Sequence, residues 1–457
     1  MPLILGAQSA AGAGAQRNSC RFDTTANTYF TSDFAGDGAE GTAKQVTYSI
    51  WCKMALEDDR LTLISGKGSS YLKIRFADTG SGFFFGTWGA ATMLSTPVFQ
   101  DPAAWMHVVI TFDTGQAAGA DRFKVWINNE QITAWDTASY PGQDSTVWMT
   151  SANDLELGSY QAGGAENFDG YMAEYVCIDN AALTPTSFGA YDSDSPTIWT
   201  PKSSDDIKLL TFGTKGYYLD FADSADMGAD VSGNGNDFTG VNVTAVNQCT
   251  DSPVNNFCTM NPLDNYYPEW TFTEGNCKIQ TKAAVYAPCL STIGMTAGKW
   301  YWEVKCISRT NGSDHLIGIS STQTTDAGHE LSEYVNDWAY YSQNGNSRND
   351  STSVSYGDAY DTGDIIGVAL DLTNSKLYFS KNGTFQDSGD PTSGASGTGA
   401  LSITAVGSTP LGAYFAGLTY WAGGSDTATF GFNFGNPPYA NTSDAADANG
   451  YGKFEYA

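Results

Sequence analysis

The chain has 457 residues, enough for two or three domains of ordinary size, with 13% aromatic residues and 50 glycines. Its 22 basic residues are outnumbered by 50 acidic ones, which gives a net charge of −28. Because binding to nucleic acid and to anionic lipid depends on positive charge, we expect neither as a partner. No apolar run is long enough to span a membrane, so membrane insertion is not expected either. The composition instead favours strands joined by tight turns.

Residues 1–18 are interpreted as an N-terminal arm. They are rich in Ala and Gly, and their short apolar patch lacks the basic region that begins a secretion signal. Such an arm is either a free tail or, in an assembly, the segment that docks onto a neighbouring subunit.

Residues 19–202 have the pattern of one β-sandwich. Residues 105–113 alternate in polarity, as a strand with one buried face does. Asn128 and Asn129 separate the next two strand patterns, and Asn tolerates the left-handed backbone of a two-residue hairpin. Because no helical period lies between the strands, a sandwich is favoured over alternating strands and helices.

The segment from Tyr171 to Ile178 carries one charge, Glu174, and apolar residues at both odd and even positions. A strand of this kind is covered on both faces, whereas a half-exposed strand alternates. We expect it to close the first sandwich, with another segment packed over its outer face. Strict alternation would place two sets on opposite faces: Tyr171, Ala173, Tyr175 and Cys177 on one, and Met172, Val176 and Ile178 on the other.

The sequence pattern changes at residues 203–267, where short strand patterns alternate with polar turns. We interpret this stretch as a structured connector, with a contribution of edge strands to one sandwich as one role. Residues 268–457 then have the pattern of a second sandwich.

Both sandwiches repeat one arrangement of elements. A long strand, an acidic turn, a second strand and an Asn-based hairpin follow one another at residues 105–135 and again at residues 364–385. In the second copy the hairpin is Asn382-Gly383, a strong signal for a two-residue turn. We infer two sandwiches in tandem, without the sequence identity of a solenoid repeat.

The first sandwich resembles a known family. The string FDGYMAEYVCIDNAALTPTSFG at residues 168–189, followed by WTPK at residues 199–202, resembles the end of laminin-G/concanavalin A-like jelly rolls in bacteriophage tail and other structural proteins. Two later strings are similar to the segment that follows this unit in such proteins: GYYLDFADSADMGADVSGNGNDFTG and TDSPVNNFCTMNPLD.

The second sandwich resembles a SPRY domain, which is itself a concanavalin-like sandwich. The strings that carry this resemblance are GKWYWEVK, HLIGIS, GDIIGVALDLTNSKLYFSKNG and FNFG. The sequence thus predicts an all-β protein built of two tandem concanavalin A-like jelly-roll β-sandwiches. Its expected parts are an arm (1–18), a laminin-G/concanavalin A-like sandwich (19–202), a structured connector (203–267) and a SPRY-like sandwich (268–457).

We expect no catalytic residues. Glycosidases of this fold need two carboxylates that flank the scissile bond, and laminarinase-type enzymes carry them in a Glu-x-Asp-x-Glu strand. The nearest string, from Asp154 to Gly158, has two acids, Asp154 and Glu156, and lacks the third; we interpret it as a strand edge with solvated charges. The three histidines give little support for a nucleophile–His–acid site, and His107 in an alternating strand is interpreted as structural.

Calcium is the metal for which the sequence offers candidate ligands. A Gly-punctuated loop offers hard oxygen ligands, which suit a flexible Ca²⁺ shell, but it lacks the distal Glu of an EF-hand. Asn-Gly-rich turns without metal are commoner, so both interpretations stay open. No other cofactor is expected. The candidate ligands are Asp230, Ser232, Asn234, Asn236 and Asp237.

Sugar binding is the chemistry with more support, because sugar rings stack on aromatic side chains while amides and carboxylates bind their hydroxyl groups. Aromatic residues in loop-like stretches are the candidates, although many such residues fill cores. Trp338 and Tyr340 are expected in the core, whereas exposure is expected for Tyr420 and Trp421 beside a glycine-rich loop. The ligand-binding candidates are Trp135, Tyr140, Trp148, Tyr420 and Trp421.

The eight cysteines have no CxxC spacing and no histidine beside a pair, so metal-ligand spacing is absent. Reduced thiols are expected, with a Cys249–Cys258 or Cys277–Cys289 bridge as the alternative.

The resemblance implies a non-enzymatic virion protein, such as a tail fibre, a tip or a head-decoration subunit. It would be assembled in the host cytoplasm and exposed on the particle. Its arm would bind other virion proteins, self-association is expected, and its sandwiches would adhere to host-surface glycan or protein. Two alternatives remain: a carbohydrate-binding module pair of cellular origin, and a glycan depolymerase.

Overall fold

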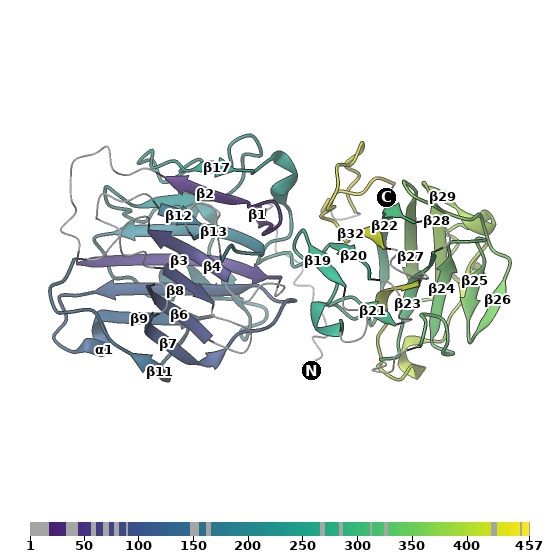
Figure 1. Cartoon of the computed structure of the whole chain (residues 1–457), viewed down its shortest axis with the longest axis horizontal. Helices are drawn as coiled ribbons and strands as arrows, with labels where there is room; N and C mark the ends of the chain where they lie inside the picture. Colours follow the sequence, from purple (N-terminus) through teal and green to yellow (C-terminus); the bar gives the residue numbers. More distant parts are fainter. Residues whose placement is uncertain are drawn as a thin grey trace. The chain divides into compact units, whose positions relative to one another are not determined.

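The computed structural model divides into two compact units, one ending at Asn256 and the other starting at Phe257 (Figure 1). Each unit is described by itself. Among the described residues, no helix has both the length and the apolar character needed to cross a bilayer. The described residues are 18–32, 44–55, 61–66, 73–76, 82–87, 90–146, 155–160, 166–265, 270–282, 287–310, 313–323, 328–421, 427–447 and 450–456.

The first unit is a sandwich of two antiparallel sheets. The order of the first sheet is β10 (Glu130–Gln131), β9 (Phe123–Ile127), β8 (Met106–Asp113), β3 (Gln45–Met54), β13 (Gly170–Asp179), β1 (Ser19–Phe22) and β18 (Gln248–Cys249), and β16 (Tyr217–Leu219) also pairs with β13. The order of the second sheet is β11 (Trp135–Ala138), β7 (Ala90–Val98), β6 (Gly82–Thr87), β5 (Lys73–Phe76), β4 (Leu61–Gly66), β12 (Leu155–Leu157), β2 (Tyr29–Ser32) and β17 (Thr239–Val241). Outside these sheets lie β14 (Gly189–Tyr191), β15 (Trp199–Pro201), α1 (Gly119–Arg122) and α2 (Ser204–Lys208).

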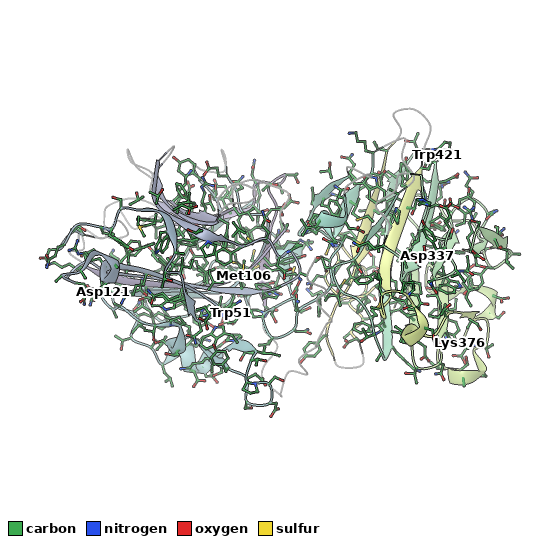
Figure 2. The ribbon with its side chains drawn as sticks, turned by 90° about the horizontal axis from the view of Figure 1, so that it is seen from below. Trp51, Met106, Asp121, Asp337, Lys376 and Trp421 are labelled. Atoms are coloured by element: carbon green, nitrogen blue, oxygen red, sulfur yellow. The ribbon has the colours of Figure 1, made fainter. Side chains whose placement is uncertain are left out.

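Aromatic residues fill the space between these two sheets. Phe85 of β6 packs against Phe112 of β8 and Phe123 of β9, with ring centroids 5.3 and 5.1 Å apart. All three are buried in one continuous core. Trp51 and Met106 lie in the interior of this unit, whereas Asp121 lies at its surface (Figure 2).

Strand β13 is buried along its whole length, which confirms that both of its faces are covered. Its alternation is interrupted, however, by a β-bulge at Glu174, where φ is 49° and the register with β3 shifts. Met172 therefore shares the sandwich core with Tyr175, and strict alternation is wrong for this strand. The outer face carries Tyr171, Ala173, Val176 and Ile178.

The segment predicted as a connector, residues 203–267, is divided by the structure. Up to Asn256 it belongs to the first unit, because β16 pairs with β13 and β18 with β1. Strand β17 likewise pairs with β2 (Figure 1). Its apolar residues, including Ile207 and Phe212, cover the outer face of the first sheet beside Val176. Strands of two or three residues leave no periodic signal, so only the pairing reveals where they belong.

The second unit is also a sandwich of two antiparallel sheets, so the predicted all-β class is confirmed. The order of one sheet is β19 (Thr271–Thr273), β20 (Lys278–Gln280), β32 (Ala428–Asn433), β22 (Lys299–Arg309), β27 (Ile365–Asp371), β28 (Lys376–Lys381) and β29 (Thr384–Phe385), and β30 (Leu401–Ser402) also pairs with β28. The order of the other is β21 (Pro288–Leu290), β31 (Phe415–Trp421), β23 (Asp314–Ser320), β24 (Asp337–Tyr341), β25 (Ser347–Asn349) and β26 (Thr352–Val354). Short 3-10 helices in the described residues are η3 (Pro185–Ser187), η4 (Ala245–Asn247), η5 (Pro262–Asp264), η6 (Gln386–Ser388), η7 (Gly394–Ser396) and η8 (Val406–Ser408).

The two Asn-based hairpins adopt the same conformation and use the same hydrogen bonds. Both turn residues have positive φ, 49° and 69° at Asn128-Asn129 and 50° and 80° at Asn382-Gly383. The Asn128 Oδ1 accepts from the His107 amide at 2.8 Å. The Asn382 Oδ1 likewise accepts from the Ile365 amide at 2.9 Å. The predicted repetition of this arrangement in both sandwiches is thereby confirmed.

A buried carboxylate holds the end of the chain against the second unit. Glu303 of β22 is fully buried, and its oxygens accept hydrogen bonds from the Glu455 amide at 2.9 Å and the Tyr456 amide at 2.7 Å. Asn433 of β32 donates to the same carboxylate at 3.0 Å, and the Tyr301 hydroxyl donates at 3.1 Å. Because charged hydrogen bonds are among the strong ones, this glutamate fixes the last residues onto the sheet.

Candidate functional site

A shallow depression of 510 Å³ opens on the first unit. Its lining combines two apolar side chains, Leu210 and Phe212, with the polar residues Ser232 and Asn234. Residues 210–214 are called its floor here, and Ser232 and Asn234 its polar wall. The preceding Leu209 is 83% exposed but does not line the depression. The complete lining consists of Leu210, Thr211, Phe212, Gly213, Thr214, Ser232 and Asn234.

The polar wall belongs to the loop that the sequence singled out for calcium. Asp230 organises this loop: Oδ1 accepts from the Tyr218 and Ser232 amides, each at 2.9 Å. Its Oδ2 accepts from the Ser232 hydroxyl and the Asn236 amide, also at 2.9 Å. Asp237 Oδ1 in turn accepts from the Asp230 amide at 2.8 Å. The five predicted ligand residues therefore lie together in one hydrogen-bonded loop.

Two asparagines attach this loop to the floor of the depression. Asn234 donates to the carbonyl oxygens of Gly213 at 2.6 Å and Gly216 at 2.9 Å. Asn236 donates to Thr214 at 3.0 Å and Gly216 at 2.8 Å. With its nitrogen engaged in this way, the Asn234 side chain presents Oδ1 as a hydrogen-bond acceptor.

These hydrogen bonds account for the loop conformation without a metal. The Asp230 oxygens face four N–H or O–H donors, whereas a calcium shell needs oxygens that converge on one point. In the described part of the chain, no three His, Cys, Asp or Glu side chains gather as a metal would require. Calcium at this loop stays a prediction.

The described aromatic candidates are divided between the two units. Trp135 and Tyr140 are half-buried and pack against the core of the first unit; Tyr140 also lies on Gly119, where a Cβ would come within 3.3 Å of its ring. Trp421 is half-buried at the end of β31 in the second unit (Figure 2). Trp148 lies outside the described residues.

Tyr420 was predicted to be exposed, and this is wrong. Its side chain is fully buried in the second core and stacks on His315, with ring centroids 5.8 Å apart. Tyr420 occupies an inward position of β31, which runs to Trp421 and so places the tyrosine within the sheet. Trp338 and Tyr340 are buried, which confirms the core expectation for both.

The environment of Glu156 also differs from the predicted one. It lies in β12, which pairs with β2 on one side and β4 on the other, so this strand is internal. Its side chain is buried, so the expectation of a solvated strand edge is wrong. Asp154 lies outside the described residues.

His107 is a structural residue in the first unit, as expected. Its ring stacks on Trp51 with centroids 4.6 Å apart. Trp199 Nε1 donates to His107 Nδ1 at 2.9 Å, so the ring proton resides on Nε2, which lies 2.7 Å from the Ser49 hydroxyl. Burial lowers the pKa of His107 to about 3, so the ring is neutral at neutral pH.

Sequence reasoning missed the floor of the depression, residues 210–214. The available signal was the pair Leu209-Leu210 within an otherwise polar stretch, but an isolated apolar pair does not distinguish a surface site from a core contact. It also missed Lys53, which forms a buried ion pair with Asp251 at 2.9 Å. All eight cysteines are free thiols, and seven of them are buried.

Two family models match the chain. Residues 24–187 match the model described as concanavalin A-like lectin/glucanases superfamily, and residues 299–413 match the SPRY domain model. A curated relative, the ATP-dependent RNA helicase DDX1 of Xenopus laevis, is 28% identical over 135 residues. This alignment takes in 29% of the chain and 17% of the helicase, so the chain spans only a small part of that relative.

Solved structures also show similarity. A putative carbohydrate binding protein from Bacteroides ovatus aligns with a TM-score of 0.33 and 18% identity, over 49% of this chain and 57% of that one. The SPRY domain of human HERC1 aligns with a TM-score of 0.26 and 14% identity, over 34% and 86%. Stonustoxin aligns with a TM-score of 0.28 and 15% identity, over 38% and 27%. Together with the family models, the two β-sandwich units establish a chain that carries a concanavalin A-like domain followed by a SPRY domain.

Proposed function

We propose that this protein is a non-enzymatic adhesin that binds a neutral glycan at the depression beside residues 230–237. The observation that carries the proposal is the pairing of an apolar floor, Leu210 and Phe212, with the polar groups of Ser232 and Asn234. Sugars present C–H faces and hydroxyl groups at once, so a shallow site of mixed character suits them. The match of residues 24–187 to a lectin-containing superfamily supports the same class of ligand.

The charge of the chain favours an uncharged glycan as the ligand. With a net charge of −28, the protein repels anionic partners at long range, although salt screens this effect. Sialylated, sulfated or phosphorylated glycans are therefore disfavoured relative to uncharged hexose polymers.

The first test is a substitution at the rim of the depression. Thr211 is exposed and lines the depression, so Thr211→Trp would fill the space while leaving the hydrogen bonds of the loop in place. We expect at least about a tenfold weaker Kd for neutral glycan, equivalent to about 1.4 kcal/mol, measured by isothermal titration after a glycan array has selected the ligand.

The control is Thr352→Trp, an exposed residue of β26 in the other unit. It should leave the affinity unchanged. Equal binding by both variants would contradict the site, and new reducing ends on incubation with host polysaccharide would favour a depolymerase instead. Repeating the titration with calcium and with EGTA checks whether the Asp230 loop contributes a metal, which would appear as a calcium-dependent affinity.

We further propose that the protein works as part of a bacteriophage virion, as a tail fibre, tip or decoration subunit. The resemblance of residues 168–189 and 250–264 to phage structural proteins supports this role. Residues 1–17 are proposed to dock onto other virion proteins, with self-association of the chain on the particle.

Removal of residues 1–17 is expected to abolish incorporation into particles while the thermal melting of the purified protein stays unchanged. Immunoblots of purified particles assembled with full-length and truncated protein measure this. Particles that retain the truncated protein would contradict docking through the arm, without bearing on glycan binding.

A further inference from the structure

Lys53 is an unusual lysine because it is only 1% exposed, on the outer face of the first sheet that also carries Trp51 and Tyr171. It lies in β3, and its ammonium Nζ is 2.9 Å from Asp251 Oδ2 and 2.8 Å from Asn256 Oδ1. Its ammonium also lies 5.6 Å from the centre of the Tyr171 ring. A nucleophilic amine, a carboxylate and a carboxamide thus meet at one buried point.

The surroundings hold these three groups in position. Trp105 Nε1 donates to Asp251 Oδ1 at 2.8 Å, and the Ser19 hydroxyl donates to the Asp251 carbonyl at 2.6 Å. Asn256 Nδ2 donates to the Ala103 carbonyl at 2.8 Å, so its amide nitrogen faces away from Lys53. Beside the ion pair, Trp51, Trp105, Tyr171, Trp199 and Cys249 form a buried apolar cluster.

We propose that Lys53 and Asn256 become joined by an intramolecular amide bond. Asp251 accepts a proton from the Lys53 ammonium, which frees the lone pair of Nζ. Nζ then attacks Cγ of Asn256, and the new N–C bond forms as the bond from Cγ to Nδ2 breaks. Asp251 returns this proton to the departing nitrogen, then accepts and passes on the second proton, which the attacking nitrogen sheds as the neutral amide forms. The side-chain nitrogen of Asn256 thus leaves as an ammonium ion, and the aspartate ends as it began.

The geometry supplies what this reaction needs. The attacking nitrogen is 2.8 Å from the oxygen bonded to the carbon that it attacks, and such proximity replaces a bimolecular encounter. Asp251 is within hydrogen-bond distance of the amine, as a general base must be. Asn256 is half-buried, so ammonia has a route to solvent.

The bond would have a structural consequence for the first unit. It connects the central strand β3 to a residue 203 positions further along the chain, the last residue of this unit. A covalent closure of this length restricts the unfolded chain and leaves the folded state as it is. The linked unit should therefore resist unfolding and proteolysis at the point where the second unit begins.

Mass spectrometry of the full-length protein tests the proposal. We expect an intact mass lower than that of the sequence by one ammonia molecule. After trypsin digestion, residues 45–60, uncleaved at Lys53, should appear joined to residues 216–278, and fragmentation should place the link between Lys53 and Asn256. The fragment data are essential, because succinimide formation at an Asn-Gly pair such as Asn382-Gly383 also releases ammonia.

Three variants complete the test. Lys53→Met and Asp251→Asn should each restore the full mass, the first by removing the nucleophile and the second by removing the base. Asn256→Asp should yield the same joined product as the wild type, with water as the leaving group. Full sequence mass and free cleavage after Lys53 in folded wild-type protein, after prolonged incubation, would overturn the proposal regardless of how the variants fold.

Discussion

Acid is expected to destabilise the first unit through His107. Between pH 7 and pH 4 the free energy of unfolding should fall by about 3 kcal/mol, because each pH unit below 6.5 costs about 1.4 kcal/mol. Burial lowers the pKa of His107 from 6.5 to about 3, so the unfolded chain binds the proton more tightly than the folded one. The stability that the neutral ring contributes is therefore complete above pH 6.5 and is lost as the pH falls below that value.

The matched variant is His107→Phe, which keeps an aromatic ring against Trp51 but cannot titrate. It should be less stable than wild type at pH 7, because Trp199 and Ser49 lose their partner. Its free energy of unfolding should nevertheless depend less steeply on pH. Urea unfolding at several pH values, followed by hydrogen exchange in peptides of the first unit, measures both effects. Parallel pH curves for the variant and the wild type would contradict this role of His107.

In the second unit, two buried carboxyls oppose the effect that acid has through its buried histidine. Burial likewise lowers the pKa of His315 to about 3, which destabilises the fold as the pH falls. Burial also raises the pKa of Asp264 and of Asp337 to about 6, so these carboxyls take up protons in the folded state first. The stability that these protonated carboxyls contribute is complete below pH 3.8, their ordinary pKa, and is lost as the pH rises through 6. Acidification therefore increases their contribution, which offsets the stability lost at His315.

Replacement of Glu303 by Ala is expected to destabilise the second unit by about 3 kcal/mol and to release the end of the chain. The substitution removes the acceptor of four hydrogen bonds, among them those from the Glu455 and Tyr456 amides. The Asn433 amide and the Tyr301 hydroxyl would then lose a partner in the interior, where an unsatisfied polar group is costly. Glu303→Gln should fall between wild type and Ala, because one of its two groups is a donor facing other donors.

Two measurements separate these effects. Chemical denaturation reports the loss of stability, and hydrogen exchange of the amides at 453–456 reports release of the C-terminal segment. Asp444→Ala is the control, since this exposed side chain lies in the same segment and should leave both measurements unchanged. Slow exchange at 453–456 in Glu303→Ala would contradict the role of this carboxylate as a clamp.

The candidate site was accessible to sequence reasoning only in part. Residues 230–237 stood out because Asp, Ser, Asn and Gly gather there, and these types build hydrogen-bonded loops. The loop lies beside Leu210 and Phe212 because Asn234 and Asn236 donate hydrogen bonds to the carbonyl oxygens of residues 213–216. No local sequence pattern predicts this contact. Tyr420 was misjudged because it precedes a glycine-rich stretch in the chain, whereas in space its ring stacks on His315 within the second core.

The sequence by itself determined the all-β class, the two sandwiches and both Asn-based hairpins, because alternation within strands and turn residues between them are local patterns that can be read along the chain. The tertiary structure alone decided that residues 203–256 complete the first unit and that a bulge at Glu174 reassigns the faces of β13. It alone brought Lys53 to Asp251 and Asn256, about 200 positions away. Contacts of that separation arise when distant strands close over one core, so the side chains that meet there are selected by packing and leave no periodic trace in the sequence.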